Sequence, residues 1–475
     1  MSKHPRLVIA APQSGSGKTT VTLAVMKRLV DEGYKVQGFK VGPDYIDTSY
    51  YQGITSNPGR NLDSWMTSEN MVKEFFQEGS KKADISVIEG VMGLFDGYSG
   101  KDDRGSTAQI AKELNAPVIL VVDAKSQARS VAALLHGFYH FDPEVNLKGV
   151  IFNKVGSDSH FTYLKEALSS SNLPIEIIGY FPREENLVLP ERHLGLVPFL
   201  EQNESKEMNN FMDSLLNISK KYLDSEKLVN LAHSAPDWQE VKPYFFVKRT
   251  FENKSINNNI SVVNDKKHVV AVAYDKAFSF YYQENLEWLE EQGLKLVYVS
   301  PLSDESLPEN TKSLYFGGGF PELFTKELSE NKSFIDSVRQ LAERGAPILA
   351  ECGGLMYLCE ELENVEGDSY ELVGLVPAKI QMKEKLKALG YREGKSKVNN
   401  FFLNKDEVVR GHEFRYSEMV VKDEESFPWA YELSGRFGTR KEGYSKDNIL
   451  ASYLHVHLGS NLEAGLNWVE SIKKN

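Results

Sequence analysis

The chain has 475 residues, and at roughly 100 to 200 residues per domain it is expected to form two or three domains. It carries 67 acidic residues against 55 Lys and Arg, and the net charge of −12 argues against a protein that binds nucleic acid or an anionic membrane. Hydrophobic residues make up 41% of the chain, which excludes global disorder, and two cysteines, Cys352 and Cys359, support neither a disulfide framework nor a zinc knuckle.

Short apolar runs alternate with amphipathic stretches through the first 200 residues. This alternation is typical of a doubly wound, mostly parallel sheet that helices cover on both faces. The predicted strands are 6–11, 36–41, 85–88, 118–122, 149–152 and 175–180, and the predicted helices are 20–32, 107–114 and 126–139.

A second alternating pattern begins at residue 268, so we predict two α/β domains, 1–235 and 268–475. Residues 236–267 are irregular and rich in Asn and charge, as in SINNNI and NDKK, and are predicted to be a linker. The predicted strands of the second half are 268–274, 295–300, 313–316 and 347–350, and its predicted helices are 280–292 and 354–362.

The segment APQSGSGKTT, residues 11–20, lies between a predicted strand and a predicted helix, where a phosphate loop belongs. Its backbone N–H groups can surround phosphates, Lys18 can reach the β and γ phosphates, and Thr19 can ligate Mg²⁺. Pro12 stands where the usual pattern has Gly, so the start of the loop differs from the commonest version. The predicted nucleotide-binding residues are Ser14, Gly15, Ser16, Gly17, Lys18, Thr19, Thr20 and Lys40.

Charged residues also follow the next strands, Lys40 in FKVGPDYID and Glu89 in VIEGVMGLFDG. The carboxyl ends of parallel strands meet at one edge of the sheet, where open α/β sheets bind ligands. Thr19, Asp47 and Glu89 are therefore predicted to hold Mg²⁺. Asp44, Asp47 and Asp96 are candidate catalytic acids on the loops, although each alone also fits an ordinary turn aspartate.

Cys352, in ILAECGGLMYL, falls between a predicted strand and a predicted helix and resembles a nucleophile elbow. A sharp turn there exposes the sulfur, and the N-terminus of the helix is expected to stabilise its thiolate. The triple glycine 317–319 ends an earlier strand and can present N–H groups to an oxyanion. The predicted oxyanion donors are Gly318, Gly319 and Gly353. The alternative for either cysteine is a small core residue, which we favour for Cys359.

Two histidines lie near the C-terminus in SYLHVHLGSN. His455 and His457 are two residues apart and share a face if the strand is regular. Together with Cys352 and the glycines they indicate a cysteine-based catalytic site.

The order of the motifs resembles the cobyrinate a,c-diamide synthase family over essentially the whole chain. The matching motifs are APQSGSGKTT, KVGPDYID, EGVMGLFDG, LPERHLGLVP, GGGFPE, AECGGLMYL, GHEF and SYLHVH, of which LPERHLGL is the most specific. The resemblance implies an ATP-binding domain like dethiobiotin synthetase, followed by a class I glutamine amidotransferase domain. It also implies amidation of the a and c carboxylates of cobyrinic acid, a step of cobalamin biosynthesis, with ATP, Mg²⁺ and glutamine.

The resemblance further implies roles for single residues. Cys352 is the glutaminase nucleophile and His455 its base. Lys18, Thr19, Lys40 and Glu89 serve ATP and Mg²⁺, and Asp44, Asp47 and Asp96 serve phosphorylation and amidation. The chain departs from the expected patterns at His457, where class I amidotransferases have Glu, and at Arg415, where His is expected after GHEF.

An anionic polycarboxylate substrate needs a local basic pocket in an acidic protein. Arg192 and His193, with Arg183 nearby, are the predicted substrate residues, and a solvated rim is the alternative for the arginines.

Two other functions stay open from the sequence. The same chemistry could act on hydrogenobyrinic acid or nickel sirohydrochlorin, or the chain could be a phosphate-loop nucleotide switch with an inactive glutaminase domain. The predicted partners are small molecules, without nucleic acid or membrane, and a homodimer is considered. The longest apolar stretch falls far short of the roughly 20 residues of a membrane-spanning helix, and no cleavable signal is recognised, so a cytoplasmic location is predicted.

Overall fold

The computed structural model describes residues 3–184, 191–192, 195–202, 205–249, 268–436 and 438–475. Its internal contacts divide the chain into two compact units, Met1–Lys242 and Pro243–Asn475. The division falls within the predicted linker 236–267, of which residues 250–267 lie outside the described residues. Trp238 packs in the first unit, where its ring lies 4.9 Å from that of Phe76. Phe245 packs in the second unit, 6.2 Å from the Trp288 ring.

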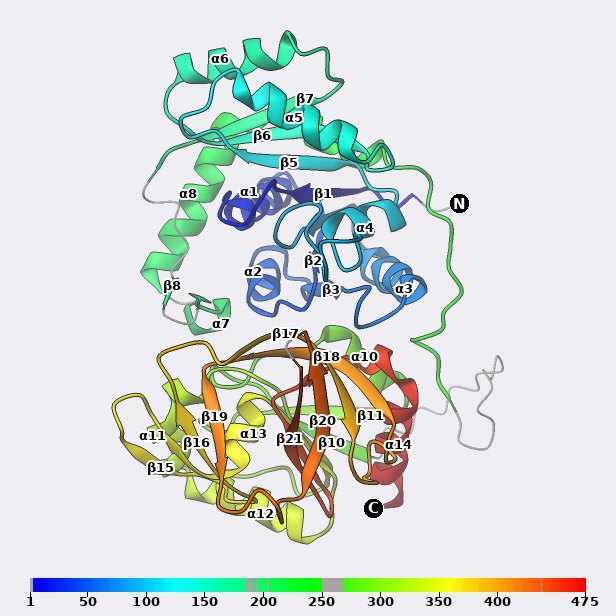
Figure 1. Cartoon of the computed structure of the whole chain (residues 1–475), viewed down its shortest axis with the longest axis vertical. Coiled ribbons are helices and arrows are strands. Elements are labelled where there is room, and N and C mark those ends of the chain that lie inside the picture. The colour runs from blue at the N-terminus through cyan, green and yellow to red at the C-terminus, as the bar shows by residue number, and fades with distance from the viewer. Residues whose placement is uncertain (1–2, 185–190, 193–194, 203–204, 250–267, 437) are drawn as a thin grey trace. The chain divides into compact units, whose positions relative to one another are not determined.

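The first unit is built on a seven-stranded sheet with the order β3-β2-β4-β1-β5-β6-β7, in which all the pairs are parallel (Figure 1). Its strands are β1 Arg6–Ala10, β2 Val36–Val41, β3 Arg60–Leu62, β4 Ile85–Glu89, β5 Val118–Asp123, β6 Leu147–Val155, β7 Glu176–Pro182, β8 Glu191–Arg192 and β9 Gly195–Leu196. Its helices are α1 Lys18–Asp31, α2 Ile46–Thr55, α3 Glu69–Ser80, α4 Thr107–Glu113, α5 Ser130–Phe141, α6 Asp158–Ser169, α7 Phe199–Gln202, α8 Lys206–Tyr222 and α9 Ser225–His233.

Both faces of this sheet are covered. Along β1, Val8 and Ile9 point to opposite faces, and both are fully buried. Ile9 belongs to a core cluster that the sheet forms with residues of α1, α2, α8 and α9. Continuous apolar strands of this kind are typical of a parallel sheet between two helical layers, and the predicted doubly wound fold is confirmed.

The second unit combines a parallel and an antiparallel half in one ten-stranded sheet with the order β11-β10-β12-β13-β22-β21-β20-β17-β18-β23. A separate four-stranded sheet has the order β15-β14-β16-β19, and its strands come from the part of the chain between β13 and β20. The strands are β10 His268–Ala273, β11 Leu294–Val299, β12 Thr311–Phe316, β13 Ile348–Glu351, β14 Cys359–Glu363, β15 Ser369–Glu371, β16 Val376–Met382, β17 Ala388–Ser396, β18 Val408–Arg415, β19 Ser417–Val421, β20 Trp429–Gly435, β21 Gly438–Lys446, β22 Ile449–Ser452 and β23 His455–Val456. The helices are α10 Gln283–Glu291, η2 Pro321–Leu323, α11 Thr325–Glu330, α12 Lys332–Glu343, α13 Gly353–Leu358, η3 Leu458–Ser460 and α14 Leu462–Lys474.

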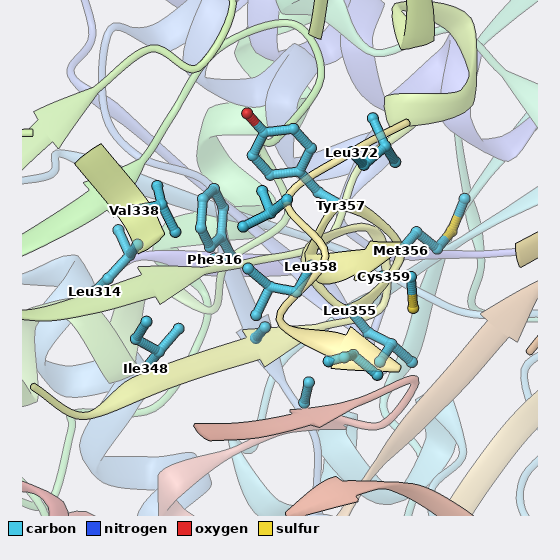
Figure 2. Close-up of a cluster of buried hydrophobic side chains, with 14 of the residues drawn as sticks. Leu314, Phe316, Val338, Ile348, Leu355, Met356, Tyr357, Leu358, Cys359 and Leu372 are labelled. Atoms are coloured by element: carbon cyan, nitrogen blue, oxygen red, sulfur yellow. The ribbon is translucent and has the colours of Figure 1, made fainter. Parts of the chain in front are cut away.

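The helix predicted at 354–362 is wrong in its second half. Helix α13 ends at Leu358, and the chain continues as β14, which pairs with β16 from Cys359 onward. Strand pairing across the chain therefore overrides local helix preference here. The short helix is held by its burial, because Leu355 and Leu358 lie in a core cluster with Phe316 (Figure 2). Cys359 is fully buried in the same cluster, which confirms its prediction as a core residue.

Candidate functional site

The phosphate-loop segment joins β1 to α1 in the first unit. Gly15 and Gly17 have φ values of +78° and +84°, which favour glycine. A Cβ at Gly17 would overlap the amide of Asn153, whose Nδ2 donates to the Ser16 carbonyl at 2.8 Å. Lys154 Nζ donates to the Gly15 carbonyl at 3.2 Å. The end of β6 therefore supports the loop, which the sequence reasoning missed although both residues follow an apolar strand.

The other predicted members of the loop lie along the same stretch. Ser14 is exposed, and the Ser16 hydroxyl donates to the Gln13 carbonyl at 2.9 Å. Thr20 lies in the first turn of α1. Lys18 Nζ donates to the Met92 carbonyl at 3.0 Å, so the loop after β4 contacts the phosphate-loop lysine.

A cluster of charged side chains forms at the carboxyl ends of β2 and β4. Lys40 pairs in register with Glu89, and its Nζ lies 2.8 Å from Glu89 Oε1. The same ammonium also forms an ion pair with Asp47, from the first turn of α2. The Thr19 hydroxyl donates to Glu89 Oε1 at 2.6 Å. The four residues come from three separate segments of the sequence, which the parallel register of β2 and β4 helps to bring together.

Burial and charge set the protonation of this cluster. Burial, and then the charge of Asp44, raises the pKa of Asp47 to about 7. Burial alone would raise the pKa of Glu89 as well, but Lys40 and Lys18 lower it below its ordinary value. Burial, and then the charge of Lys40, lowers the pKa of Lys18 to about 8. The carboxylates of Asp47 and Glu89 therefore share the positive charge of Lys40, and Lys18 adds to it at Glu89.

The two remaining predicted acids lie on the loops beside this cluster. Asp44 Oδ1 accepts the Asp47 N–H at 2.7 Å, which fixes the start of α2. Asp96 Oδ2 accepts the Gly93 N–H at 3.0 Å, and a Cβ at Gly93 would lie 2.7 Å from the Pro12 carbonyl. Asp96 therefore lies next to the start of the phosphate loop, as expected for a loop that follows a neighbouring strand.

Tyr51 is a member of this cluster that the sequence reasoning missed. It is fully buried on α2, and its hydroxyl donates to Glu89 Oε2 at 2.6 Å. No motif indicated it, although its spacing of four residues from Asp47 places both on one face of the helix.

The predicted substrate residues are described only in part. Arg183 follows β7 and is exposed. Arg192 belongs to the two-residue strand β8, and its side chain, like the whole of His193, lies outside the described residues.

In the second unit, Cys352 lies at the turn between β13 and α13 with a φ of +47°, which is strained for a residue with a side chain. Its N–H donates to the Ser452 carbonyl at 2.7 Å, and its Sγ lies 3.7 Å from the Phe414 carbonyl. The turn needs a small residue after it, because a Cβ at Gly354 would lie 2.5 Å from Phe316 Cβ. These features match the predicted nucleophile elbow.

The triple glycine passes directly beside this turn. Gly354 N–H donates to the Gly317 carbonyl at 3.1 Å, and a Cβ at Gly353 would lie 3.1 Å from Gly319 N. The backbones of Gly319 and Gly353 are therefore close neighbours. The Gly318 N–H donates to the Phe280 carbonyl at 3.3 Å, so this amide is already engaged within the protein.

His455 follows the end of β22 and begins the two-residue strand β23, which pairs with β18. β13 and β22 are parallel partners with Glu351 opposite Ser452, and the chain continues from β22 to His455. A Cβ at Gly318 would overlap the His455 ring, so the imidazole lies against the glycine segment. The glycine segment 317–319 therefore lies against both the His455 ring and the turn that carries Cys352.

The predicted stabilisation of a thiolate is wrong in direction. Burial, and then the charges of Glu322 and Glu413, raises the pKa of the Cys352 thiol well above its ordinary value. The charge of Arg415 and a hydrogen bond from the Gly353 backbone lower it, but by less than burial raises it. Burial, and then His412, lowers the pKa of His455 to about 3. At neutral pH the resting site therefore holds a neutral thiol and a neutral imidazole.

His457 is buried next to aromatic side chains. Its Nδ1 accepts the Gly459 N–H at 3.0 Å, and its ring lies 5.0 Å from the Tyr282 ring and 6.0 Å from the Phe245 ring. Burial lowers its pKa to about 3, so it is neutral at pH 7. These contacts place the imidazole next to two aromatic rings.

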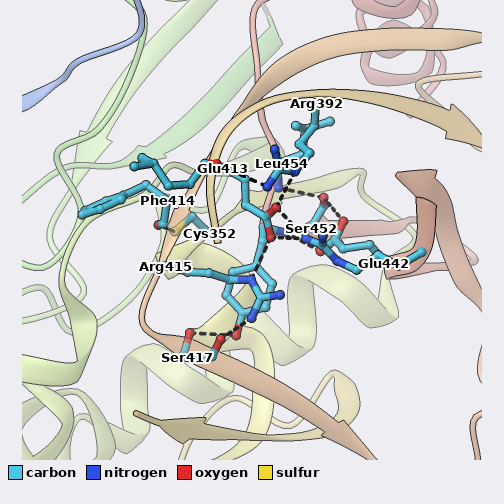
Figure 3. Close-up of polar contacts among 12 residues, drawn as sticks. Cys352, Arg392, Glu413, Phe414, Arg415, Ser417, Glu442, Ser452 and Leu454 are labelled. Atoms are coloured by element: carbon cyan, nitrogen blue, oxygen red, sulfur yellow. Dashed lines mark hydrogen bonds and ion pairs between the residues drawn. The ribbon is translucent and has the colours of Figure 1, made fainter. Parts of the chain in front are cut away.

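Three arginines pair with the fully buried carboxylate of Glu413, the residue before Phe414, whose carbonyl faces the Cys352 sulfur (Figure 3). Arg392 Nε lies 3.0 Å from Glu413 Oε2, Arg415 Nε lies 2.7 Å from Oε1, and Arg440 forms a further ion pair. Burial alone would raise the pKa of Glu413, but Arg415 and Arg440 lower it below its ordinary value. Arg415, where the expected pattern has His, thus takes part in an ion cluster that the sequence reasoning did not anticipate.

Two further features of the described residues, a cavity and the lengths of the helices, lie apart from the predicted site residues. A cavity of 630 Å³ along β7 is lined by apolar residues, by Ser169 and Asp224, and by Lys165, Lys221 and Lys227, and none of the predicted site residues lines it. Across the described ranges, no helix is both long and apolar enough to cross a membrane.

The fold and the two sites define a class of protein, in which a nucleotide-binding domain precedes a glutamine amidotransferase domain. Residues 7–197 match the family described as the CobQ/CobB/MinD/ParA nucleotide binding domain. Residues 269–462 match the CobB/CobQ-like glutamine amidotransferase domain.

Similarity along the whole chain narrows this class. The chain is 43% identical over 468 residues to the cobyrinate a,c-diamide synthase of Priestia megaterium, which covers 98% of this chain and 97% of that protein. It is 43% identical over 451 residues to that of Caldanaerobacter subterraneus subsp. tengcongensis, covering 95% and 94%. It is 40% identical over 471 residues to that of Streptococcus sanguinis, covering 99% of each. The chain belongs to the cobyrinate a,c-diamide synthase family, which confirms the resemblance seen in the sequence.

Proposed function

We propose that the chain amidates the a and c carboxylates of cobyrinic acid, with ATP to activate each carboxylate and glutamine to supply nitrogen. The observation that carries this proposal is the 40–43% identity, along the whole chain, to relatives named cobyrinate a,c-diamide synthase. A phosphate-loop cluster in one unit and a cysteine elbow in the other support it, because the reaction needs both an activating site and an ammonia-releasing site.

The first unit activates the carboxylate. A carboxylate is a poor electrophile, and transfer of the γ-phosphoryl group of ATP converts it to an acyl phosphate. The backbone of residues 14–20 binds the phosphates, while Lys18 and Lys40 neutralise the charge that develops on the transferred group. Lys18 suits this role because its Nζ already points to the loop after β4, at Met92.

Thr19, Asp47 and Glu89 would hold Mg²⁺ at this edge. They offer a hydroxyl and two carboxylates, the oxygen donors that Mg²⁺ prefers, and the Thr19 hydroxyl already contacts Glu89. Among the described residues, no group of three or more His, Cys, Asp or Glu could hold a metal by itself. Phosphate oxygens of the nucleotide would therefore complete the ligand set, and the ion would supply charge neutralisation.

Asp44, Asp47 and Asp96 act on the reacting carboxylate and on ammonia. Ammonia that arrives as ammonium must lose a proton before it attacks, and a nearby carboxylate can accept that proton. The new C–N bond forms as the bond from the carbonyl carbon to the phosphate oxygen breaks, and inorganic phosphate leaves. Asp96 lies next to Gly93 and the phosphate loop, which suits this step.

The second unit releases ammonia from glutamine. The Cys352 sulfur attacks the side-chain amide carbon while His455 takes the thiol proton, and His455 then returns it to the leaving ammonia. Water hydrolyses the thioester to glutamate and restores the thiol. A neutral thiol beside a neutral imidazole allows this transfer as the sulfur attacks.

The oxyanion of the tetrahedral intermediate is bound by backbone N–H groups of Gly319 and Gly353. Their backbones are neighbours beside Cys352. Gly318, the third predicted donor, contributes less because its N–H is engaged with Phe280. Arg192 and His193, with Arg183, stay the predicted basic pocket for the tetrapyrrole, and a cytoplasmic location and a homodimer stay predictions.

The test is the mass of the product formed from each candidate macrocycle. Cobyrinic acid, hydrogenobyrinic acid and nickel sirohydrochlorin are each incubated with ATP and Mg²⁺, with glutamine in one set and an ammonium salt in the other. We expect two amidations of cobyrinic acid in both sets. Amidation of another macrocycle alone would reassign the substrate, and glutamine-dependent ATP turnover without any amide product would favour the nucleotide switch.

A further inference from the structure

Two buried carboxyl groups accept main-chain N–H groups on either side of His455. The Tyr453 N–H donates to Glu442 Oε1 at 2.7 Å, and the Val456 N–H donates to Glu351 Oε1 at 2.9 Å. The exposed fraction is 2% for Glu351 and 3% for Glu442. The short segment that carries the imidazole is therefore held at both ends by carboxyl oxygens.

Glu351 connects this segment to the nucleophile. It is the last residue of β13 and directly precedes Cys352. Its second oxygen accepts the Tyr315 hydroxyl at 3.0 Å, from the adjacent strand β12. One carboxyl group thus joins the chain after His455 to the strand that ends in Cys352.

Glu442 makes the corresponding connection on the other side. Its Oε2 accepts the Ser452 hydroxyl at 2.6 Å, and Ser452 Oγ in turn accepts the Leu454 N–H at 2.9 Å. The Ser452 carbonyl accepts the Cys352 N–H at 2.7 Å. The chain before His455 is therefore tied, through Ser452, to the backbone of the nucleophile.

Both carboxyl groups are costly for the fold. Burial raises the pKa of Glu351 to about 8, and burial together with the charge of Glu413 raises that of Glu442 to about 7. An apolar side chain of similar size would avoid this penalty. Glu413 differs, because three arginines offset the burial of its charge. Both of these costly carboxyl groups bind the short segment that carries His455.

We propose that Glu351 and Glu442 are positioning residues for the glutaminase step. They hold the His455 imidazole at the right place relative to Cys352 by fixing the main chain on both sides, and neither contacts glutamine. This inference rests on the proposed function, because it takes His455 as the base. Displacement of a catalytic group by about 1 Å can cost about a hundredfold in rate, so small shifts of this segment would be visible in kcat.

The test compares two substitutions at each position in the full chain. Glu351→Met and Glu442→Met keep the length of the side chain but remove the acceptor oxygen, whereas Glu351→Gln and Glu442→Gln keep an acceptor. For each Met variant we expect kcat of glutamine hydrolysis to fall by about ten- to a hundredfold, with KM for glutamine within about threefold and ammonia-dependent amidation unchanged. For each Gln variant we expect recovery to within about threefold of the unsubstituted chain.

Ser313→Ala is the matched control. Ser313 is buried in the same sheet, where its hydroxyl donates to the Pro347 carbonyl at 2.6 Å and accepts from Trp468 Nε1 at 3.0 Å. It should lower stability without changing kcat. Three results would each overturn the inference. The first is an unchanged kcat in both Met variants. The second is a loss of kcat in the Gln variants as large as in the Met variants, and the third is a Met variant whose ammonia-dependent amidation falls as much as its glutamine-dependent activity. If the Met variants do not fold, the Gln variants still decide, because loss of kcat in both would contradict a role through backbone acceptors. Absence of glutamine hydrolysis by the unsubstituted chain would instead refute the proposed function.

Discussion

Two buried clusters of charged side chains, one in each unit, have opposite charge balances. In the first unit the Lys40 ammonium faces two carboxylates, Asp47 and Glu89, and the pKa of Asp47 is raised to about 7. In the second unit three arginines face the single carboxylate of Glu413, whose pKa is lowered. The first unit thus has a carboxylate-rich cluster at the edge of its sheet, where the Thr19 hydroxyl of the phosphate loop also contacts Glu89. The arginine cluster lies in the unit that carries Cys352, where the three cations offset the burial of one carboxylate.

The comparison predicts that the two units can be inactivated separately. Cys352→Ala should abolish glutamine-dependent amidation because the nucleophile is lost, while amidation at high ammonia concentration continues. Lys18→Ala should abolish both activities, because the phosphoryl group is no longer stabilised. The measurement is amide product with glutamine and with ammonium, with Cys359→Ala as the matched control for a buried cysteine. A folded Cys352→Ala variant that is inactive with ammonia would refute the separation.

The next largest effect is expected at His455. His455→Ala should lower glutamine-dependent activity by about a thousandfold or more, on the scale of losing a general base, and spare the ammonia-dependent reaction. His457→Ala should cost much less, because His457 packs against Tyr282 and its Nδ1 accepts a backbone N–H.

Alkylation of Cys352 at a series of pH values checks this assignment. An alkylation rate that is unchanged in His455→Ala but falls in His457→Ala would reverse the roles of the two histidines.

The acids near the phosphate loop provide a third test. Asp44→Asn, Asp47→Asn and Asp96→Asn keep the size of the side chain and remove its charge. We expect substrate amidation to fall by a factor of hundreds, which corresponds to about 3 to 4 kcal/mol of transition-state stabilisation. Glutaminase activity should persist. Asp84→Asn, which changes an exposed loop acid that accepts the Lys35 N–H, is the control. Unchanged amidation in all three variants would return these residues to ordinary turn aspartates.

The sequence predicted the elements that its local patterns describe. The apolar strands before the phosphate loop, Lys40 and Glu89 were visible, and parallel strand topology then implied that these residues share one edge. The elbow at Cys352 was visible for the same reason, since a strand, a Cys-Gly-Gly turn and a helix follow one another in the chain.

The remaining features depend on pairing between distant segments. The antiparallel half of the second sheet places Arg392, Glu413 and Arg440 together from strands β17, β18 and β21, and no local spacing predicts that meeting. The thiol pKa depends on burial in the folded protein, so the elbow motif gave the wrong direction. Local sequence therefore predicted positions at the sheet edge better than it predicted their electrostatic surroundings.

The contribution of the arginine cluster to the stability of the second unit can be measured by removing the charge of Glu413. Glu413→Gln leaves three arginine side chains around a neutral amide, and we expect the free energy of unfolding to fall by about 3 to 5 kcal/mol. Glu393→Gln is the control, because Glu393 pairs with Arg410 at 2.9 Å with both side chains nearly half exposed, and its effect should stay below about 1 kcal/mol. Denaturation by urea measures both. Equal effects in the two variants would mean that the cluster is no more than a surface ion pair.

The smallest effect is a pH dependence at Glu442, which separates an uncompensated buried acid from the compensated Glu413. The pKa of Glu442 is raised by burial, and then by the charge of Glu413, from an ordinary 4.5 to about 7. A raised pKa means that the folded state holds the proton more tightly than the unfolded state. The resulting stabilisation is fully present below about pH 4.5 and is lost as the pH rises toward 7.

Glu442→Gln cannot titrate but still offers an acceptor oxygen to the Tyr453 N–H, so comparing it with the unsubstituted chain removes the contribution of every other titrating group. Between pH 5 and pH 8 we expect the unsubstituted chain to lose about 2 kcal/mol relative to Glu442→Gln, measured as the difference in unfolding free energy in urea at each pH. A difference that stays constant over this range would show that Glu442 keeps an ordinary pKa in the folded protein, and that its burial is compensated as fully as that of Glu413.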